Sequence, residues 1–479
     1  MNYYIGIDLG TSSCKGLLVD RDGNIISSSS FDYEVYSPYP SYSEQNPSDY
    51  LLAAEKIIKE LSKGRENDIK GLSFSGQMHG LVILDEKDEV IRPCILWNDS
   101  RTEKQTDYLN EVIGKSTLSS LTGNIAFAGF TAPKILWIKE NEPENFKKIR
   151  KIMLPKDYLC YKLTGVFTTD YSDASGTLLL DVKNKCWSNR MCEICSIKEE
   201  QLPQLNESYQ CIGKLLPKYG LPNCIVTPGA GDNSAAAIGN GTIEQGECNI
   251  SLGTSGTIFI SQDKFSVDKN NSLHSFAHAN GKYHLMGCIL TAASARKWFL
   301  EDILSSFDYT QDEKDIENVK STDVIFLPYL AGERSPYNDT KARGAFINLS
   351  SSTSKGEMSL AIMEGVAFAI KNCLEVASSN GLEIKSSTIC GGGSKSRIWR
   401  QIFADVLNIP IQSLKTEQGP SYGATILAMI GNKEYSSFRE AKKHLISIKE
   451  TIYPRKRTDN LSLKYEKFKK LYTLLKQLY

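Results

Sequence analysis

Two stretches of the chain share one pattern of apolar and polar positions, and this pattern predicts a β-hairpin in each. Apolar runs rich in β-branched residues flank Gly10-Thr11-Ser12-Ser13 near the start and Gly253-Thr254-Ser255-Gly256 past the middle. A glycine turn between two such runs is typical of paired strands. Because glycine allows close backbone approach and hydroxyls add donors, each turn can form a nest for phosphate oxygens. The copies differ in that Asp8 precedes the first turn, whereas Ser251 precedes the second.

A single glycine-hydroxyl motif of this kind is most often an ordinary hairpin turn. The occurrence of two such motifs is what points to a phosphate site. The chain has 479 residues, which fits two domains of about 240 residues better than one core. The spacing of the hairpins matches that length and indicates a duplicated domain. We therefore expect domains at residues 1–242 and 243–479, with the two nests facing one polyphosphate.

The charge balance favours a small-molecule partner. Formal net charge is zero and the pI is about 6.9, which gives no basic field for nucleic acid or for an anionic membrane. No window approaches the roughly 20 apolar residues of a membrane span, and the first residues lack the pattern of a signal peptide. We expect a cytoplasmic protein.

The 12 cysteines are spread along the chain and do not form a disulfide framework. The tightest group is Cys186, Cys192 and Cys195. A zinc site would need a fourth ligand nearby, so this group is either a metal site or, more often for such spacing, a set of thiols.

Polar residues follow two predicted strands in the first half. Gln77 and His79 lie in a turn at the end of the apolar run that begins at Ile69. Side chains at strand ends of open α/β sheets tend to face the ligand crevice; a solvated loop is the alternative. After the next strand, Trp97 and Asp99 offer the aromatic and polar groups with which proteins bind sugars, unless Trp97 is structural.

Two further loops are rich in carboxylates, at Pro155-Lys156-Asp157 and from Asp170 to Ser175. The pattern does not distinguish which of them approaches the cleft. Asp232 is the strongest chemical candidate, because a strand and the glycine-rich turn Pro228–Gly231 precede it and small residues follow it. It is either a helix N-cap or a general base for a sugar hydroxyl.

The second half contains a strand, a triple-glycine turn and a helix start between Ile389 and Ser396. This arrangement is typical of an anion or nucleotide site, although it is neither G-x-G-x-x-G nor a P-loop. The small-residue segment from Gly419 predicts a helix that backs the same pocket. Apolar positions from Leu360 to Leu374 predict a long helix, and an amphipathic helix is expected from Leu463 to Leu478.

These motifs together resemble those of the FGGY carbohydrate kinases. GFTAPKILWIKEN at residues 129–141 and the segment around Met363-Glu364-Gly365-Val366 look like the two family signatures. The strings SGQMHG, ILWNDSR, LPKDYL, DASGTLLLD and GERSP are similar to those of family members that act on D-xylulose. The resemblance runs collinearly to about residue 430. It implies an α/β fold of two ribonuclease H-like domains, as in actin, hexokinase and the Hsp70 ATPase, with a cleft between them.

The resemblance also implies roles for individual residues. Asp232 corresponds to the catalytic base that takes a proton from the terminal hydroxyl of the sugar, and Asp8 to the carboxylate near Mg²⁺ and the transferred phosphate. The positions matching the sugar site, with weaker candidates last, are Met78, His79, Asn233, Gln77, Trp97 and Asp99. Those matching the nucleotide and phosphate site are Thr11, Lys15, Gly253, Thr254, Gly392, Gly393 and Ser396. Lys15, Ala292 and Ser396 depart from glycerol kinase, which has arginine, glycine and asparagine there.

The implied activity is ATP-dependent phosphorylation of D-xylulose to D-xylulose 5-phosphate. Another pentulose or polyol, such as ribulose, xylitol or erythritol, is the alternative acceptor, since substrate choice depends on a few hydroxyl contacts. A sugar-binding regulator without chemistry is a further alternative, against which the retained Asp8 and Asp232 argue. A homodimer is a family expectation.

Overall fold

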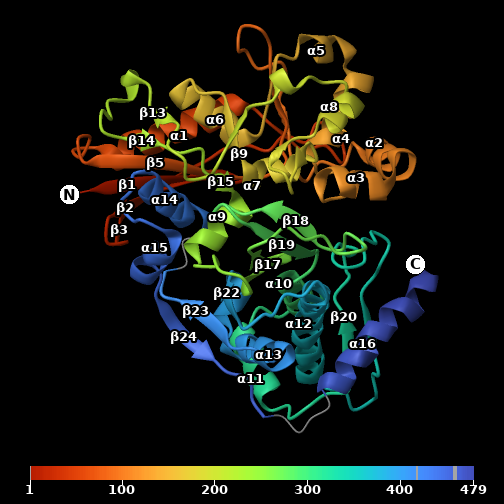
Figure 1. Ribbon diagram of the computed structural model, residues 1–479. Coiled ribbons are helices and arrows are strands. Elements are labelled where there is room, and N and C mark those ends of the chain that lie inside the picture. Colours follow the sequence, from red (N-terminus) through yellow and green to blue (C-terminus); the bar gives the residue numbers. More distant parts are fainter. Residues whose placement is uncertain (1, 417–418, 457–460) are drawn as a thin grey trace.

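The computed structural model describes residues 2–416, 419–456 and 461–479. These residues form two α/β domains, each built on a mixed sheet of seven strands (Figure 1). The first sheet has the order β13-β14-β5-β1-β2-β3, with β15 also paired to β5. Its strands are β1 (Tyr3–Leu9), β2 (Ser13–Asp20), β3 (Ile25–Asp32), β5 (Ile69–Gly76), β13 (Gly213–Lys214), β14 (Ile225–Val226) and β15 (Ala230–Gly231).

The second sheet has the order β18-β19-β17-β16-β22-β23-β24. Its strands are β16 (Glu247–Leu252), β17 (Gly256–Gln262), β18 (His274–Ala277), β19 (Tyr283–Ile289), β22 (Ser386–Cys390), β23 (Ile411–Leu414) and β24 (Ile448–Ile452). In each sheet a central strand pairs antiparallel with the strand that follows it and parallel with a strand that a long connection brings to its other side. This shared topology confirms the predicted duplication.

Both predicted hairpins are present at the matching place in their sheets. In the first, β1 pairs with β2 until Leu9 faces Cys14, and in the second, β16 pairs with β17 until Leu252 faces Gly256. The alternating apolar positions put one row of side chains of each strand against the helices that cover the sheet. The two glycine turns therefore lie at corresponding edges of the two sheets.

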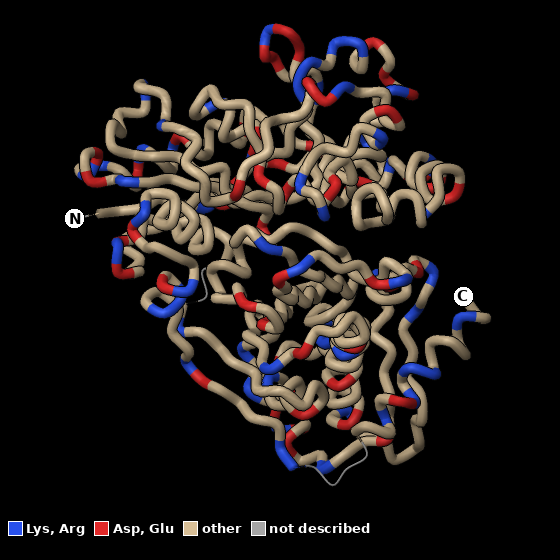
Figure 2. Tube along the Cα trace, in the orientation of Figure 1, with Lys and Arg blue, Asp and Glu red and all other residues tan. Residues whose placement is uncertain are grey.

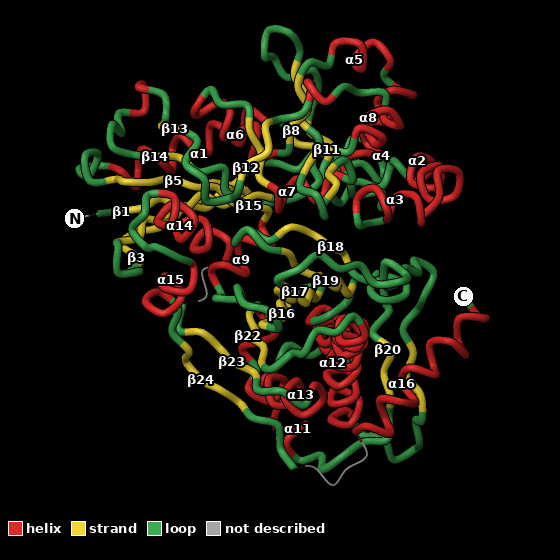
Figure 3. The backbone as a smooth tube through the Cα atoms, in the orientation of Figure 1, coloured by secondary structure: helices red, strands yellow, loops and turns green. Residues whose placement is uncertain are grey.

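Helices cover the sheets in both domains (Figure 3). Those of the first half are α1 (Pro47–Ser62), α2 (Glu103–Asp107), α3 (Lys115–Thr122), α4 (Thr131–Asn141), α5 (Pro143–Lys148), α6 (Pro155–Thr164), α7 (Tyr171–Ala174), α8 (Asn189–Cys195) and α9 (Asp232–Gly239). Those of the second half are α10 (Ala293–Lys297), α11 (Tyr309–Glu317), α12 (Lys355–Ser379), α13 (Arg397–Leu407), α14 (Gly419–Gly431), α15 (Phe438–Leu445) and α16 (Leu461–Leu475). The long helix expected around Leu360–Leu374 is α12.

Short two-stranded sheets complete the fold. They pair β4 (Glu44–Gln45) with β7 (Cys94–Ile95), β6 (Val82–Leu84) with β8 (Lys151–Met153), β9 (Thr168–Asp170) with β12 (Gln204–Asn206), β10 (Leu180–Asp181) with β11 (Cys186–Trp187), and β20 (Ile325–Leu327) with β21 (Ala345–Ile347). Those before residue 242 lie in the connections of the first sheet and carry the loops that reach its ligand edge.

Helix α14 returns to the first sheet although it follows most of the second domain in sequence (Figure 1). It packs on α9 and β1. The backbones approach closely at two glycines: a Cβ on Gly423 would lie 1.8 Å from the carbonyl oxygen of Ala235, and a Cβ on Gly6 would lie 2.1 Å from the carbonyl oxygen of Ser421. These two positions therefore admit only glycine. The helix therefore joins the two domains, instead of backing the glycine loop of the second domain as the sequence suggested.

The amphipathic C-terminal helix is α16. It packs on α12 and β20, with Phe468 fully buried and with the Tyr465 hydroxyl donating to Asn372 Oδ1 over 2.7 Å. Lysine and arginine alternate with aspartate and glutamate over both domains (Figure 2), in line with zero net charge. In the part of the chain that the structure describes, no helix has the length and apolar character needed to span a membrane.

Candidate active site

Asp8 lies near the end of β1, between two strands that modulate its charge. Its neighbours across the sheet are Lys15 on β2 and Ser75 on β5. Burial raises the pKa of Asp8 to about 6, and the Ser75 hydroxyl and the Lys15 ammonium oppose that rise. Among the described residues, Asp8 Oδ1 is a buried oxygen without a hydrogen-bond donor. A bare, hard carboxylate oxygen of this kind suits a magnesium ion or its bound water.

Asp232 is the first residue of α9, and the N-cap position is Gly231. The N-cap interpretation of Asp232 is therefore wrong. Its Oδ1 accepts hydrogen bonds from the Asn233 amide over 2.6 Å and from Asn233 Nδ2 over 2.9 Å. Burial and then the nearby Asp8 charge raise the pKa of Asp232 to about 7, which the Asn233 bonds partly offset. The two carboxylates thus share one electrostatic environment, and Asn233 orients Asp232.

Met78 and His79 follow β5; Met78 contacts the turn that leads to Asp232, and His79 contacts Gly176, which Met78 also reaches. A Cβ on Gly231 would lie 2.9 Å from Met78 Cγ, and one on Gly176 would lie 2.5 Å from the His79 ring and 3.1 Å from Met78 Cε. His79 has φ of +70°, a conformation uncommon for non-glycine residues, although histidine adopts it more often than most. The structure therefore brings these predicted residues and Asp232 together.

The His79 ring is neutral and fixed in one tautomer. Its Nδ1 lies 2.7 Å from the carbonyl oxygen of Gly176, so Nδ1 carries the proton and Nε2 is left as an acceptor. The ring stacks on Phe130 with centroids 4.6 Å apart. Burial, together with the positive charges of Lys134 and Arg334, lowers the pKa of His79 to about 3, although the bond to Gly176 opposes this shift. His79 can orient a hydroxyl donor but does not serve as a base.

Gln77, Thr11 and Trp97 lie beside the first nest. The Gln77 amide donates to the Leu9 carbonyl over 2.8 Å, and its side chain donates to Gln45 Oε1 over 2.9 Å. Trp97 Nε1 donates to Thr11 Oγ1 over 3.0 Å, while the Trp97 side chain stays 48% exposed. An exposed indole next to the nest leaves an apolar wall available to a ligand.

Asp99 differs from its neighbour Trp97, because its carboxylate is buried and bonded to protein. It accepts from the Ser43 amide over 2.6 Å and from both Nε and a terminal nitrogen of Arg101 over 2.9 and 2.6 Å. Its oxygens are therefore used by the chain itself. Asp99 holds the loop on which Trp97 stands, and this arrangement favours a supporting role.

Five of the residues predicted for the nucleotide and phosphate site line one cavity of about 950 Å³ in the second domain, whereas Lys15 lies on β2 of the first sheet, opposite Asp8. Gly253 and Thr254 come from the turn between β16 and β17, and Gly392, Gly393 and Ser396 come from the turn between β22 and α13. Trp298 and Tyr309 form part of the opposite wall. A cavity of this size with two glycine turns and aromatic walls suits a nucleotide.

Ser396 and Ala292 are occupied in holding this cavity together. Ser396 caps α13, since its hydroxyl accepts from the Trp399 amide over 3.2 Å. The Ala292 amide donates to the Thr254 carbonyl over 2.9 Å. The Ser396 departure from glycerol kinase therefore coincides with a structural hydrogen bond of the side chain, whereas the Ala292 bond is made by a backbone amide that glycine would also supply.

A buried charge cluster lies behind the Asp232 turn. Its residues come from the two carboxylate-rich segments that the sequence predicted as loops, but Pro155-Lys156-Asp157 begins α6, and Asp170 ends β9 with α7 directly after it. Lys156 Nζ lies 2.6 Å from Asp157, 2.8 Å from Asp170 and 3.5 Å from Asp173, and all four side chains are at most 2% exposed. Burial raises the pKa of Asp157 and, more strongly, of Asp173, because one ammonium cannot balance three carboxylates. Lys156 packs directly against Gly76 at the end of β5.

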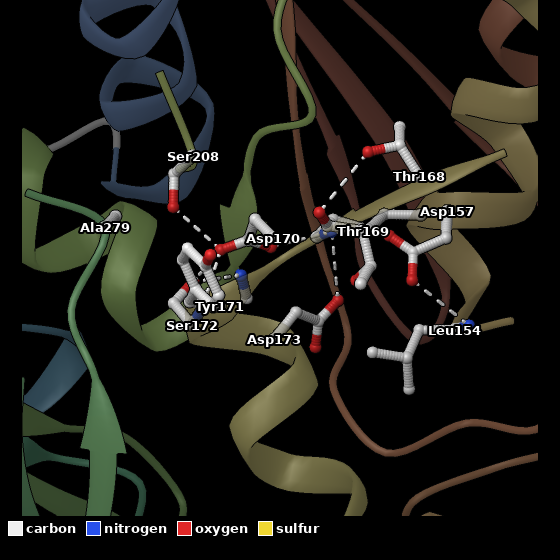
Figure 4. A network of polar contacts seen from close by, with 12 residues as sticks. Leu154, Asp157, Thr168, Thr169, Asp170, Tyr171, Ser172, Asp173, Ser208 and Ala279 are labelled. Carbon is white, nitrogen blue, oxygen red and sulfur yellow. Dashed lines mark hydrogen bonds and ion pairs between the residues drawn. The ribbon is translucent and has the colours of Figure 1, made fainter. Parts of the chain in front are cut away.

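This cluster connects through Ser172 to the turn that carries Asp232. Figure 4 shows Ser172 and Ser208 beside Asp170. Asp170 Oδ2 accepts from the Ser172 amide over 2.8 Å and from the Ser208 hydroxyl over 2.7 Å, and the Ser172 hydroxyl also donates to it. The Gly231 amide in turn donates to Ser172 Oγ over 3.2 Å. The sequence drew attention to these two segments because they are rich in carboxylates and small residues. Their burial was not predictable from that composition.

The cysteine group of the sequence divides in the structure. Cys186 is exposed, whereas Cys192 and Cys195 are buried in α8 and its surroundings. All 12 cysteines are free thiols, which confirms that the chain carries no disulfide framework.

A duplicated α/β domain with paired carboxylates at one sheet edge and a glycine-lined cavity at the other defines a two-domain phosphotransferase. Family models agree with this class. Residues 3–239 match the N-terminal domain of the FGGY family of carbohydrate kinases, and residues 248–431 match its C-terminal domain. The chain therefore belongs to the FGGY family of carbohydrate kinases.

Individual relatives agree over almost the whole length. A xylulose kinase of Staphylococcus xylosus is 37% identical over 464 residues, which cover 95% of this chain and 96% of the relative. Among solved structures, a xyloylose kinase from Brucella ovis aligns with a TM-score of 0.95 at 38% identity, covering 100% of both chains. A gluconate kinase from Lactobacillus acidophilus aligns with a TM-score of 0.92 at 27% identity, covering 100% of this chain and 97% of that one.

Proposed function

We propose that this protein transfers the γ-phosphoryl group of ATP to the O5 hydroxyl of D-xylulose and releases ADP and D-xylulose 5-phosphate. The name of the Staphylococcus xylosus relative supports this acceptor. The observation that carries the chemistry is the position of Asp232, a carboxylate oriented by Asn233 directly after Gly231, which Met78 contacts; burial raises its pKa to about 7. A base with this pKa is poised to take a hydroxyl proton at neutral pH.

In this proposal, Asp232 Oδ2 accepts the proton of the sugar hydroxyl while the hydroxyl oxygen forms a bond to the γ-phosphorus. The bond from phosphorus to the bridging oxygen of ADP breaks, and its electron pair leaves with ADP. Asn233 keeps Asp232 in place through its two bonds to Oδ1. Met78, His79 and Asn233 bind the sugar, Trp97 and Gln77 border it, and Asp99 supports the Trp97 loop.

The nucleotide is proposed to occupy the cavity of the second domain, between Gly253-Thr254 and Gly392-Gly393, with Ser396 at its edge. The first nest, including Thr11 and Lys15, binds the oxygens of the γ-phosphoryl group while it is transferred to the sugar. Asp8 would hold Mg²⁺ through its unpartnered Oδ1. When bound, the metal neutralises charge on the phosphate oxygens during transfer.

The assignment of parts to domains follows the same division. We propose that residues 1–242 carry the sugar site and the base, and that residues 243–479 carry the nucleotide site. The packing of α14 on α9 and β1 makes the first sheet dependent on the second half of the chain. We further propose a cytoplasmic location, which suits a protein with 12 free cysteines.

The alternative is a different acceptor. The gluconate kinase with the same fold and the small number of hydroxyl contacts that select a sugar favour testing ribulose, xylitol and erythritol as well. A regulator without chemistry is disfavoured, because Asp8 and Asp232 are both present and electrostatically coupled.

The test is ADP release measured with a panel of ketopentoses and polyols. We expect kcat/KM to be highest for D-xylulose and turnover to disappear in Asp232→Asn. A higher kcat/KM for another pentulose or polyol would show that this compound, and not D-xylulose, is the preferred acceptor. The absence of turnover with every acceptor would contradict the proposal as a whole.

A further inference from the structure

One loop of the second domain holds a cationic side chain rigidly at the boundary with the first domain. The loop is Gly332–Pro336, and Glu333 anchors it, since Glu333 Oε1 accepts from the Leu290 amide over 3.0 Å and from the Arg334 amide over 2.8 Å. Ser335 pairs with the end of β19, where its amide donates to the Cys288 carbonyl over 2.9 Å and its hydroxyl accepts from the Cys288 amide over 3.1 Å. The backbone of Arg334 is therefore fixed on both sides.

The Arg334 side chain crosses to the first domain. Its guanidinium carbon lies 4.8 Å from the centroid of the Phe127 ring. Phe127 packs edge-on against Phe130 with centroids 5.4 Å apart, and Phe130 in turn stacks on His79. The guanidinium is also close enough to lower the pKa of His79 and of His274. Arg334 thus lies at the His79 end of the proposed sugar site.

This guanidinium lacks a compensating anion. Within residues 2–416, 419–456 and 461–479, no carboxylate forms an ion pair with Arg334. The carboxyl group of its sequence neighbour Glu333 accepts from the Leu290 and Arg334 amides instead, and burial raises the pKa of Glu333 to about 8 although the Arg334 charge opposes that rise. A half-buried guanidinium with five donors and no anion is costly unless a ligand supplies acceptors. Sugar hydroxyl and carbonyl oxygens are such acceptors.

The order of contacts along the site orients the sugar. Met78 contacts Gly231, next to Asp232, through Cγ, and contacts Gly176, beside His79, through Cε. A sugar with its reacting hydroxyl at Asp232 therefore extends along Met78 toward His79. In D-xylulose the end remote from O5 carries the C1 hydroxyl and the C2 carbonyl.

We propose that Arg334 binds the oxygens at the end of the acceptor sugar that is remote from Asp232, which makes it a specificity residue supplied by the second domain. This inference rests on the proposed sugar kinase function. Its guanidinium donates to the C1 hydroxyl and to the C2 carbonyl, while contact with the Phe127 ring holds the guanidinium in place. The sugar then contacts both domains, so that sugar binding favours their approach and a ketose is preferred over the polyol that lacks the carbonyl.

The test compares Arg334→Met and Arg334→Lys with wild type in steady-state kinetics and in calorimetric titration of D-xylulose. Arg343→Met is the matched control, because Arg343 lies in the same segment and its guanidinium bonds only to the carbonyls of Thr340 and Ala342 among described residues. For Arg334→Met we expect the KM and Kd of D-xylulose to rise at least tenfold, with the KM of ATP within twofold of wild type. Arg334→Lys recovers part of this loss, since lysine keeps the charge without the planar fork.

The preference of the enzyme for D-xylulose over xylitol supplies a readout that a purely structural role of Arg334 would not change. The ratio of kcat/KM for D-xylulose to that for xylitol falls in Arg334→Met and stays at the wild-type value in Arg343→Met. Two results would overturn the inference: a KM for D-xylulose within twofold of wild type, or equal rises in both KM values together with a lower Tm. Failure of the proposed function is distinguishable, because the wild-type protein itself then shows no turnover of D-xylulose.

Discussion

The Gly231 amide donates a hydrogen bond to Ser172 Oγ over 3.2 Å, one residue before the carboxylate proposed as the base. Ser172 is bonded to Asp170, which pairs with the buried Lys156. The turn that carries Asp232 is therefore tied to a charge cluster in the interior of the first domain. A fixed turn matters because displacement of a catalytic group by about 1 Å lowers rates substantially.

We expect Ser172→Ala to lower kcat about fivefold or more, since loss of one hydrogen bond worth about 1 kcal/mol loosens the Gly231 turn. Ser208→Ala is the matched control, because Ser208 bonds to the same Asp170 oxygen but not to Gly231. Steady-state kinetics and thermal unfolding distinguish the two effects. Equal kcat values in both variants would remove Ser172 from the positioning of the base.

Asp232→Ala is expected to lose nearly all kcat while sugar binding is retained. General base catalysis contributes about 10²–10⁴-fold, and the sugar contacts of Met78 and His79 remain. Calorimetry with D-xylulose and single-turnover phosphoryl transfer give the two quantities separately. A variant whose kcat is within tenfold of the wild-type value would contradict the assignment of Asp232 as the general base.

The pH dependence of the reaction follows from the same residue. Asp232 acts as a base only when it is deprotonated, and its pKa is about 7. We therefore expect kcat/KM to rise with pH between about 5 and 8, with its half-maximum near 7. A flat profile over this range, measured with a substrate whose own ionisation does not change, would contradict the assignment.

Protein stability should change with pH in the opposite direction. The pKa of Asp232 is raised from 3.8 to about 7 in the folded protein, so the folded state binds the proton more tightly than the unfolded state. This contribution is fully present below pH 3.8 and is lost as the pH rises through about 7. Asp232→Asn cannot lose a proton, and we expect its Tm to exceed that of wild type by more at pH 8 than at pH 5. A constant difference between the two pH values would contradict this.

Gly392→Ala tests the nucleotide cavity. A Cβ on Gly392 meets no described atom within 4 Å, so the variant should fold normally and place a methyl group in the cavity. We expect the KM of ATP to rise several-fold while the KM of D-xylulose is unchanged. Gly393→Ala is the contrast, because its Cβ would lie 2.7 Å from Leu252 and should lower the Tm. An unchanged KM of ATP in Gly392→Ala would place the nucleotide elsewhere.

Much of the fold was predictable because it depends on local geometry. The alternation of apolar residues around Gly10 and Gly253 specifies strands and turns whatever surrounds them, and both hairpins are confirmed. Helix α1 begins at Pro47 with Asn46 at the N-cap position, since proline suits the first helical position. The glycine loop before Ser396 likewise carries its own conformational signal.

Other features depended on contacts between distant segments, which no local pattern displays. The sequence predicted that Lys156 and Asp170 lie in polar loops, but packing buries them together. Their ion pair offsets the free-energy cost of burying each charge. The carboxylate of Asp99 is turned inward for the same reason. The sequence by itself determined the strands and turns of the two hairpins and singled out Asp8 and Asp232 as candidate catalytic residues. The tertiary structure alone decided which charges are buried, that α14 returns to the first sheet, and that Arg334 reaches the first domain, because these depend on the free energy of long-range packing.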